Sequence, residues 1–188
     1  FEIDGLTQQH TYVASFEGYK SASQVIAAPT ENINFNLSFD VSGVVLLNGA
    51  GLEGVSVVSQ GVTATTNANG EFVLQNLYGT GNIVLEKTGY TFTGETSYTK
   101  PTTLNFESTY MLKGQVLSGS LPVANLTVYY LQASVTTDSL GWFEIEDLTQ
   151  PVSLSLIKDG YNPILTDEIF GYVDNLSYNI TYNASGKV

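Results

Sequence analysis

The sequence contains no cysteine, no arginine and only one histidine. Without cysteine, the chain can form no disulfide, no thiolate metal site and no cysteine nucleophile. With a single histidine it also lacks the usual ligands of a zinc site. Positive charge is scarce, because six lysines face eighteen acidic residues and the net charge is −12. This charge repels phosphate backbones and anionic lipids, so we expect no nucleic-acid partner and no membrane binding.

Long apolar stretches are also missing. No apolar run reaches the roughly eighteen residues of a transmembrane helix, so we expect no membrane insertion, and no charged-then-apolar leader marks a signal peptide. Apolar residues nonetheless make up 43 % of the chain, which is ordinary for a globular protein and argues against disorder.

The most informative pattern is a repeat with a spacing of 71 residues. Three segments correspond without a gap, and they begin FEIDGL at residue 1, FVLQNL at residue 72 and FEIEDL at residue 143. A long, regular period indicates one folding unit used in tandem. We interpret residues 1–39 as the C-terminal part of an incomplete copy, and residues 40–110 and 111–188 as two complete copies. The chain is therefore expected to be a piece of a longer protein.

Apolar and polar residues alternate within each copy, as in GVSVVSQ, GEFVLQN and TLNFES. Such alternation, interrupted by Gly, Asn and Thr, is typical of half-buried strands. Several short strands at regular spacing predict a β-sandwich or barrel. Phe72 and Phe143 occupy the same place in the repeat, and both are expected to point into a core.

Glycines mark the turns and two of the strands. Residues 66–70 and 137–141 each end in a glycine and contain Asn or Asp, which predicts hairpin turns. Gly43 and Gly114 fall inside the first strand of each complete copy, which indicates a bulge or the close approach of another group.

The junctions between copies are short. Only residues 107–110 separate the last expected strand of the second copy from the first strand of the third. No Pro- or Ser-rich linker intervenes, so we expect the copies to stack into a stiff rod. The first copy lacks the residues of three strands. Its inward residues, which include Phe1, Tyr12 and Phe35, are therefore expected to be covered by upstream residues or by a strand from another molecule.

These motifs resemble the carboxypeptidase regulatory-like domain, a seven-stranded, transthyretin-like β-sandwich. In residues 40–110 the matching positions are Gly43, Leu52, Gly54, Val55, Val57, Thr66, Gly70, Phe72, Gly89 and Tyr90. In residues 111–183 they are Gly114, Val116, Pro122, Val123, Val128, Thr137, Asp138, Gly141, Phe143, Gly160 and Tyr161. The resemblance implies an all-β chain of tandem seven-stranded, immunoglobulin-like or transthyretin-like sandwiches.

The resemblance also implies a function. Domains of this family are non-catalytic and are strung together in bacterial surface proteins. Related collagen-adhesin B-type (Cna-B) modules can form an isopeptide bond between Lys and Asn, promoted by an acidic residue. Lys113 has Ser42 as its counterpart, and Glu86 has Ile157, so neither copy has both residues and we do not expect the bond.

Few residues suggest chemistry. A Ser-His-Asp triad would have to use His10, whose counterparts in the other copies are not histidine, so we expect no enzyme and no cofactor. Asn67, Asn69 and Glu71 have a calcium-like spacing, but the last copy replaces two of them, so a hairpin turn is the better interpretation and we expect no metal.

Two kinds of surface residue are candidates for binding. Trp142 is expected to point outward beside Tyr129 or Tyr130, where it would stack on a sugar or anchor a partner, or else pack across strands. Five Asn-x-Ser/Thr sequons are candidate glycosylation sites, at Asn36, Asn125, Asn175, Asn179 and Asn183.

Together these observations predict a non-catalytic extracellular or cell-surface array that serves as stalk, spacer or adhesive scaffold. The expected partners are neighbouring copies of the module, and a glycan or a host or cell-surface protein. Two alternatives stay open. One is a carbohydrate-binding module that uses an exposed aromatic face, and the other is a filament subunit completed by strand donation.

Overall fold

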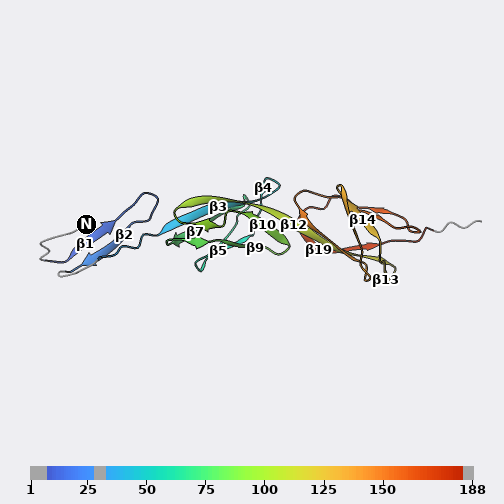
Figure 1. The fold of residues 1–188 in the computed structure, drawn as a ribbon, viewed down its shortest axis with the longest axis horizontal. Coiled ribbons are helices and arrows are strands. Elements are labelled where there is room, and N and C mark those ends of the chain that lie inside the picture. Colours follow the sequence, from blue (N-terminus) through green and yellow to red (C-terminus); the bar gives the residue numbers. More distant parts are fainter. Residues whose placement is uncertain (1–7, 28–32, 184–188) are drawn as a thin grey trace, which may run out of the picture. The chain divides into compact units, whose positions relative to one another are not determined.

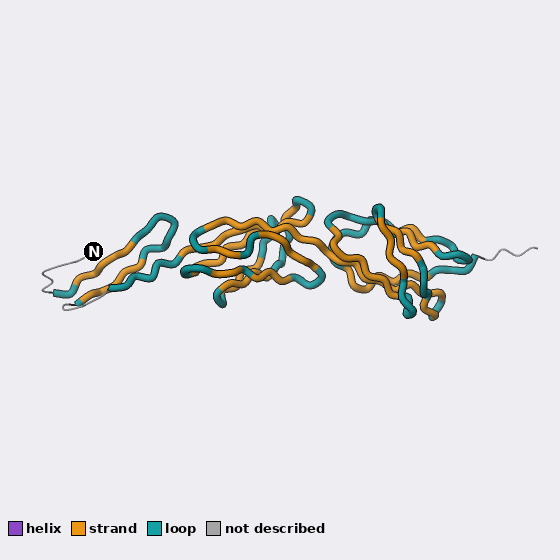
Figure 2. Tube along the Cα trace, viewed as in Figure 1, coloured by secondary structure: helices purple, strands orange, loops and turns teal. Residues whose placement is uncertain are grey.

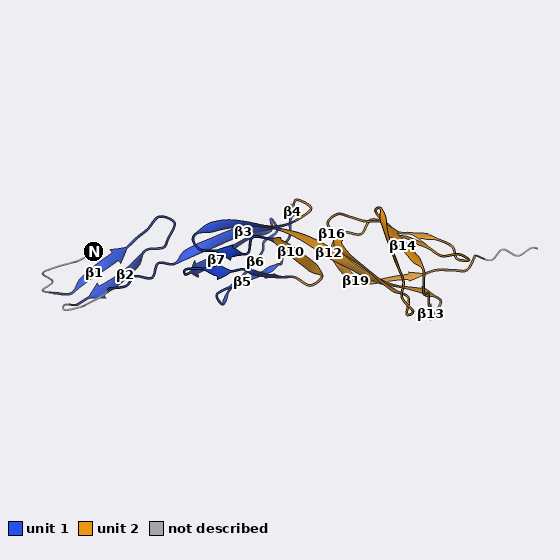
Figure 3. Ribbon diagram, viewed as in Figure 1, with its two compact units in different colours: residues 1–46, 50–86, 94–106 blue, residues 47–49, 87–93, 107–188 orange. Residues whose placement is uncertain are grey.

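The computed structural model describes residues 8–27 and 33–183. These residues form strands and turns and contain no helix, which confirms the all-β prediction (Figure 2). The chain divides into two compact units (Figure 3). Unit 1 comprises residues 1–46, 50–86 and 94–106, and unit 2 comprises residues 47–49, 87–93 and 107–188. The division into copies at 1–39, 40–110 and 111–188 stays a prediction.

Unit 1 is built from strands (Figure 1), and most of the side chains buried within it are apolar, among them Phe39, Val41, Val57 and Leu74. Its strands are β1 (His10–Ala14), β2 (Ala22–Ile26), β3 (Phe39–Leu47), β4 (Ala50–Gly51), β5 (Ser56–Ser59), β6 (Val62–Thr65), β7 (Glu71–Leu77), β8 (Gly81–Asn82), β9 (Val84–Glu86) and β11 (Ser97–Tyr98), with the start of β12 (Thr102–Ser118). β3 pairs antiparallel with β7, and β5 lies between β6 and β9 in a separate sheet. Every second residue of β3 is buried, as the alternation predicts.

Unit 2 has the same kind of architecture. Its strands are β10 (Tyr90–Gly94), the rest of β12, β13 (Leu121–Pro122), β14 (Thr127–Tyr130), β15 (Ala133–Thr136), β16 (Trp142–Leu148), β17 (Ser155–Ile157), β18 (Ile164–Leu165) and β19 (Val173–Asn179). β12 pairs antiparallel with β16 and parallel with β19. A second sheet has the order β15-β14-β17-β18. The core residues with at most 1 % exposure are Tyr110, Leu112, Val116, Leu126, Val128, Ile145, Val152, Leu154 and Leu156.

The predicted inward phenylalanines face strand glycines in both units. Phe72 lies opposite Gly43 and Phe143 lies opposite Gly114, and each ring is 3 % exposed. A Cβ atom at Gly43 would lie 2.5 Å from Phe72 Cζ, and one at Gly114 would lie 2.6 Å from Phe143 Cζ. The close approach expected from the strand glycines is therefore confirmed, because each glycine makes room for a ring.

Turns are present at both predicted places, but they are not hairpins, because each joins strands of different sheets, β6 to β7 and β15 to β16. A side chain organises each of these turns. Asn67 Oδ1 accepts hydrogen bonds from the amides two and four residues later, both at 2.9 Å. Asp138 Oδ1 does the same at 2.8 Å and 2.8 Å. Gly70 and Gly141 both have a φ of 76°, the left-handed conformation that favours glycine. These Asx turns therefore lead the chain from one sheet into a strand of the other, β7 in unit 1 and β16 in unit 2.

The N-terminal segment, residues 1–39, is described only in part. β1 and β2 form an antiparallel hairpin in which Val13 and Val25 are 65 % and 57 % exposed. Phe1 and the rest of the FEIDGL segment lie outside the described residues. The expectation that upstream residues or another molecule cover this copy therefore stays a prediction.

Candidate functional site

Trp142 begins β16 and lies opposite Gln115 of β12. Its neighbour Phe143 points into the core, so the alternation of the strand turns the indole away from it. The indole is half-buried, and Lys113 Nζ lies 5.8 Å from the centre of a Trp142 ring. The outward orientation of Trp142 is thus confirmed, and part of its surface is covered by a cation–π contact.

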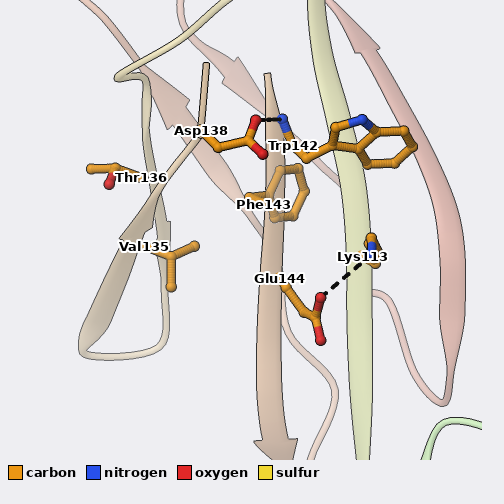
Figure 4. A pocket seen from close by; sticks show the side chains of 7 residues that line it. All are labelled: Lys113, Val135, Thr136, Asp138, Trp142, Phe143 and Glu144. Atoms are coloured by element: carbon orange, nitrogen blue, oxygen red, sulfur yellow. Dashed lines mark hydrogen bonds and ion pairs between the residues drawn. The ribbon is translucent and has the colours of Figure 1, made fainter. Parts of the chain in front are cut away.

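A hollow of about 670 Å³ runs beside β16. Figure 4 shows its lining, with Trp142 and Lys113 on one side of the strand and Val135 and Thr136 on the other. Its remaining lining residues are Asp138, Phe143 and Glu144. The volume lies within the range of small-molecule sites, about 300–1,000 Å³. The hollow offers apolar ring surface together with one ammonium and two carboxylates, a combination that can stack on a ring and hydrogen-bond to its polar substituents.

Lys113 and Glu144 form a cross-strand ion pair at the rim of this hollow. Lys113 Nζ lies 3.6 Å from Glu144 Oε2, and their side chains are 43 % and 41 % exposed. An exposed pair of this kind contributes at most about 1 kcal/mol to stability. The Lys113 ammonium is therefore a surface group that lies at the rim of the hollow and is paired with Glu144.

Tyr129 and Tyr130 are not brought together with Trp142. Both tyrosines belong to β14, in the sheet with β15, β17 and β18, whereas Trp142 belongs to the sheet of β12. Tyr129 is 47 % exposed and lines a different hollow of about 400 Å³, beside Asn125 and Ile157. Tyr130 is half-buried. The alternation predicted which way each side chain points, but not which sheet it belongs to.

All five sequon asparagines, Asn36, Asn125, Asn175, Asn179 and Asn183, are exposed. Asn179 Oδ1 accepts a hydrogen bond of 2.9 Å from the Gly119 amide, so this side chain has a structural contact. Asn125 has a φ of 53°, which places it in a tight turn. Glycosylation of these residues stays a prediction.

The residues considered for catalysis and metal binding have local roles. His10 lies on β1 with its ring 6.4 Å from that of Tyr12. Asn67 uses its amide group within its own turn, since Nδ2 donates to Glu71 Oε2 at 3.0 Å. No cluster of three or more His, Asp or Glu residues that could hold a metal occurs among the described residues. Within the same residues, no helix is long and apolar enough to cross a membrane.

The displaced pKa values belong to groups with structural partners. Burial raises the pKa of Tyr110 to about 12, and burial also raises the pKa of Tyr178. Although burial opposes it, the hydrogen bonds from Lys20 and from the Asn76 amide hold the pKa of Asp40 below its ordinary value. The Lys20 Nζ–Asp40 Oδ1 distance is 2.7 Å. Each of these shifts moves the pKa of the group further from pH 7, whereas an acid–base catalyst works best with a pKa near the working pH.

The sequence analysis did not predict that two threonines would be buried and form hydrogen bonds. Thr66 and Thr137 are 3 % and 2 % exposed. Thr66 Oγ1 donates to the Leu52 carbonyl at 2.6 Å and accepts from the Val55 amide at 2.9 Å. Thr137 makes the matching pair of bonds, at 2.6 Å and 3.0 Å. The signal was a threonine at the same place in both copies, as the first residue of each predicted turn.

No protein-family model matches the sequence, and no curated protein matches it significantly. Several solved structures are similar. The Bacillus anthracis TIE protein is 14 % identical with a TM-score of 0.34, over 87 % of this chain and 37 % of that one. The shaft pilin SpaA from Lactobacillus rhamnosus GG is 13 % identical with a TM-score of 0.32, over 80 % and 99 %. Two B repeat units of the collagen binding protein of Staphylococcus aureus are 14 % identical with a TM-score of 0.27, over 88 % and 59 %.

This chain thus spans about 37 % of the length of the Bacillus anthracis protein. At these identities and TM-scores, the similarity assigns neither a family nor a function to the chain. The all-β architecture rests on the strands of the chain itself. The resemblance to the carboxypeptidase regulatory-like domain stays a prediction.

Proposed function

We propose that this chain is a non-catalytic scaffold, a series of β-sandwich modules that acts as stalk, spacer or filament segment of a surface protein. The seven-stranded module, the three-copy division and the extracellular location are parts of this proposal. The observation that carries it is that the two units share their buried features and differ in their exposed ones.

The shared features are those that fold a module. Phe72 and Phe143 are buried against strand glycines, and Thr66 and Thr137 make the same pair of buried hydrogen bonds. The stability of a tandem array is the sum of the stability of each unit and of the interfaces between units. Features that stabilise a single unit are therefore needed in every copy.

The exposed residues that could bind a ligand do not recur. The position of Trp142 is held by Glu71 in the preceding copy, and that of Tyr129 is held by Val58. A binding function would therefore belong to one module, whereas the folding function belongs to each. This difference favours a scaffold over a set of identical binding sites.

Single-molecule force spectroscopy on the 188-residue chain tests the proposal. When a copy of about 71 residues unfolds under force, its extended length is about 250 Å, at ~3.5 Å per residue. The chain should lengthen by this amount minus the length of the folded copy. We expect two separate steps of this size. Phe143→Ala should lower the force of one step only, and a single step for the whole chain would contradict the proposal.

A second candidate function is carbohydrate binding at the hollow beside Trp142. The hollow of about 670 Å³ with an indole at its rim favours it. Trp142 is the sole tryptophan of the chain, so its fluorescence reports directly on this hollow. Titration with a broad set of glycans should change the fluorescence, and calorimetry should show that Trp142→Ala abolishes binding while Tyr129→Ala does not. A set of glycans without effect would eliminate this candidate.

A further inference from the structure

Three glycine–tyrosine turns recur along the chain with the same backbone geometry. In each turn the tyrosine amide donates a hydrogen bond to the carbonyl three residues earlier. The distances are 3.0 Å from Tyr19 to Phe16, 3.1 Å from Tyr90 to Lys87 and 3.1 Å from Tyr161 to Lys158. The glycine before each tyrosine has a φ of 79°, 77° and 81°, at Gly18, Gly89 and Gly160 respectively. The three turns are therefore directly comparable.

In unit 1, the tyrosine of the turn belongs to a row of three rings. Tyr19 lies 5.2 Å from Phe39, and Phe39 lies 5.9 Å from Tyr98, both in edge-to-face arrangements. The middle ring, Phe39, is 0 % exposed. Edge-to-face pairs at these distances are a favourable aromatic arrangement.

Unit 2 contains a second row built in the same way. Tyr90 lies 6.5 Å from Tyr110, and Tyr110 lies 5.8 Å from Phe170. The middle ring, Tyr110, is 1 % exposed, and its hydroxyl donates to the Gln150 carbonyl at 2.7 Å. A middle ring is thus buried whenever the third ring is present.

The last turn has the first two rings of such a row. Tyr161 stacks on Tyr182 with ring centres 4.6 Å apart and an interplanar angle of 29°. The backbone around Tyr182 also matches, because the Asn183 amide donates to the Gly160 carbonyl at 2.8 Å as the Met111 amide donates to Gly89 at 3.0 Å. Tyr182 therefore stands in the place of Tyr110, yet it is 64 % exposed. Within residues 8–27 and 33–183, no third ring contacts it.

The turn glycines show the same difference. A Cβ atom at Gly18 would lie 3.2 Å from Pro101 Cγ, and at Gly89 a Cβ would overlap the ring of Tyr172. At Gly160 it would meet no described atom within 4 Å. A covering side chain therefore packs on the first two glycines and is missing from the third in the part of the chain that the structure describes.

We propose that Gly160, Tyr161 and Tyr182, the tyrosine surface, dock a further β-sandwich module of the same repeat type. This module would be joined in register after residue 183, placing one aromatic ring on Tyr182 and another side chain on Gly160. The two occupied rows show the chemistry of this partner. The inference rests on the proposed scaffold function.

A second copy of this same chain fits the surface less well. Its third-ring residues, Tyr98 and Phe170, already pack on Phe39 and Tyr110. The corresponding position of the first copy is Ala27, which has no ring. The occupant is therefore a directly joined module and not a second molecule of the chain.

The test compares the 188-residue chain with an extended protein in which a second copy of residues 112–183 follows Asn183 directly. The matched control carries residues 110–183 after a flexible Gly/Ser linker of about ten residues, which has no fixed geometry. N-acetylimidazole, which acetylates accessible tyrosine hydroxyls, is the probe, and peptide mapping locates the label. Tyr182 should react in the original chain and in the linker control, and be protected at least tenfold in the direct fusion.

A stability measurement gives a second, independent result. Tyr182→Ala should raise the unfolding equilibrium constant of the added module about 100-fold or more in the direct fusion, as expected for a buried ring, and change it little in the linker control. In the direct fusion, Phe170→Ala in the added copy should restore the acetylation of Tyr182.

Three outcomes would overturn the proposal. They are equal reactivity of Tyr182 in the fusion and the control, a direct fusion that does not fold although the linker control folds, and self-association of the original chain that Tyr182→Ala abolishes. If any of these occurs while force spectroscopy still shows two separate steps, the scaffold function stands and only the docking surface is lost.

Discussion

Thr66 and Thr137 show at the residue scale how one side chain joins two segments. Each hydroxyl is buried, donates one hydrogen bond to a backbone carbonyl and accepts another from a backbone amide. Thr66→Val or Thr137→Val keeps the shape but leaves the amide and the carbonyl without a partner. Each change should reduce the free energy of unfolding by about 2–3 kcal/mol, the cost of unsatisfied buried polar groups. Urea unfolding measures this difference.

Exposed threonines next to these residues provide the control. Thr65→Val and Thr136→Val alter side chains on the surface, so they should change the free energy of unfolding by less than about 0.5 kcal/mol. If the buried and exposed substitutions have the same effect, the hydroxyl bonds do not stabilise the units.

Tyr110 predicts a dependence of stability on alkaline pH. Its pKa is about 12 in the folded protein against an ordinary value of 10.0, so the folded state holds the proton more tightly than the unfolded state. This contribution is fully present below pH 10 and is lost as the pH rises towards 12. Urea midpoints between pH 9 and 12 should fall more steeply for the wild type than for Tyr110→Phe. Parallel curves would show that Tyr110 does not titrate as described.

At the element scale, β12 and β16 fit closely because Gly114 of β12 leaves space for the ring of Phe143 on β16. A Cβ at Gly114 would lie 2.6 Å from Phe143 Cζ and 2.9 Å from Leu176 Cβ. Gly114→Ala should therefore destabilise unit 2, because the ring must move out of a well-packed place, at a cost of about 1–3 kcal/mol. In a Phe143→Ala background the same change should cost much less.

A double-mutant cycle isolates this coupling. Residues in contact typically show interaction energies of about 0.5–3 kcal/mol, and we expect a value within that range for Gly114 and Phe143. Gly119, where a Cβ meets no described atom within 4 Å but φ is 65°, supplies a control in which backbone strain acts without crowding. Additive effects of Gly114→Ala and Phe143→Ala would contradict the proposed fit.

At the scale of the whole molecule, the two units should tolerate damage separately. Phe72→Ala and Phe143→Ala each remove a ring that is 3 % exposed, and each should destabilise its own unit by about 3–5 kcal/mol. The other unit should be much less affected. Hydrogen exchange of β7 and β16 amides, followed separately, measures both units in one sample. A loss below about 1 kcal/mol would contradict the burial of the ring.

Much of the fold could be predicted from local patterns. Alternation in GEFVLQN placed Phe72 inward, and the glycines at positions 70 and 141 marked turns that the structure contains. These features depend on residues close together in the chain, whose geometry follows from strand periodicity and backbone preference. The outward direction of Trp142 was predictable for the same reason.

Which strands become neighbours was decided only by the tertiary structure. Trp142 and Tyr129 both point outward, but β16 and β14 belong to different sheets, so the predicted common aromatic face does not form. The ion pair of Lys113 with Glu144 and the row of Tyr90, Tyr110 and Phe170 likewise join residues far apart in sequence. By itself the sequence determined the strands, their faces and their turns, because these are local. Pairing, burial of hydroxyls and the rows of rings required the folded chain, because they depend on contacts that periodicity does not specify.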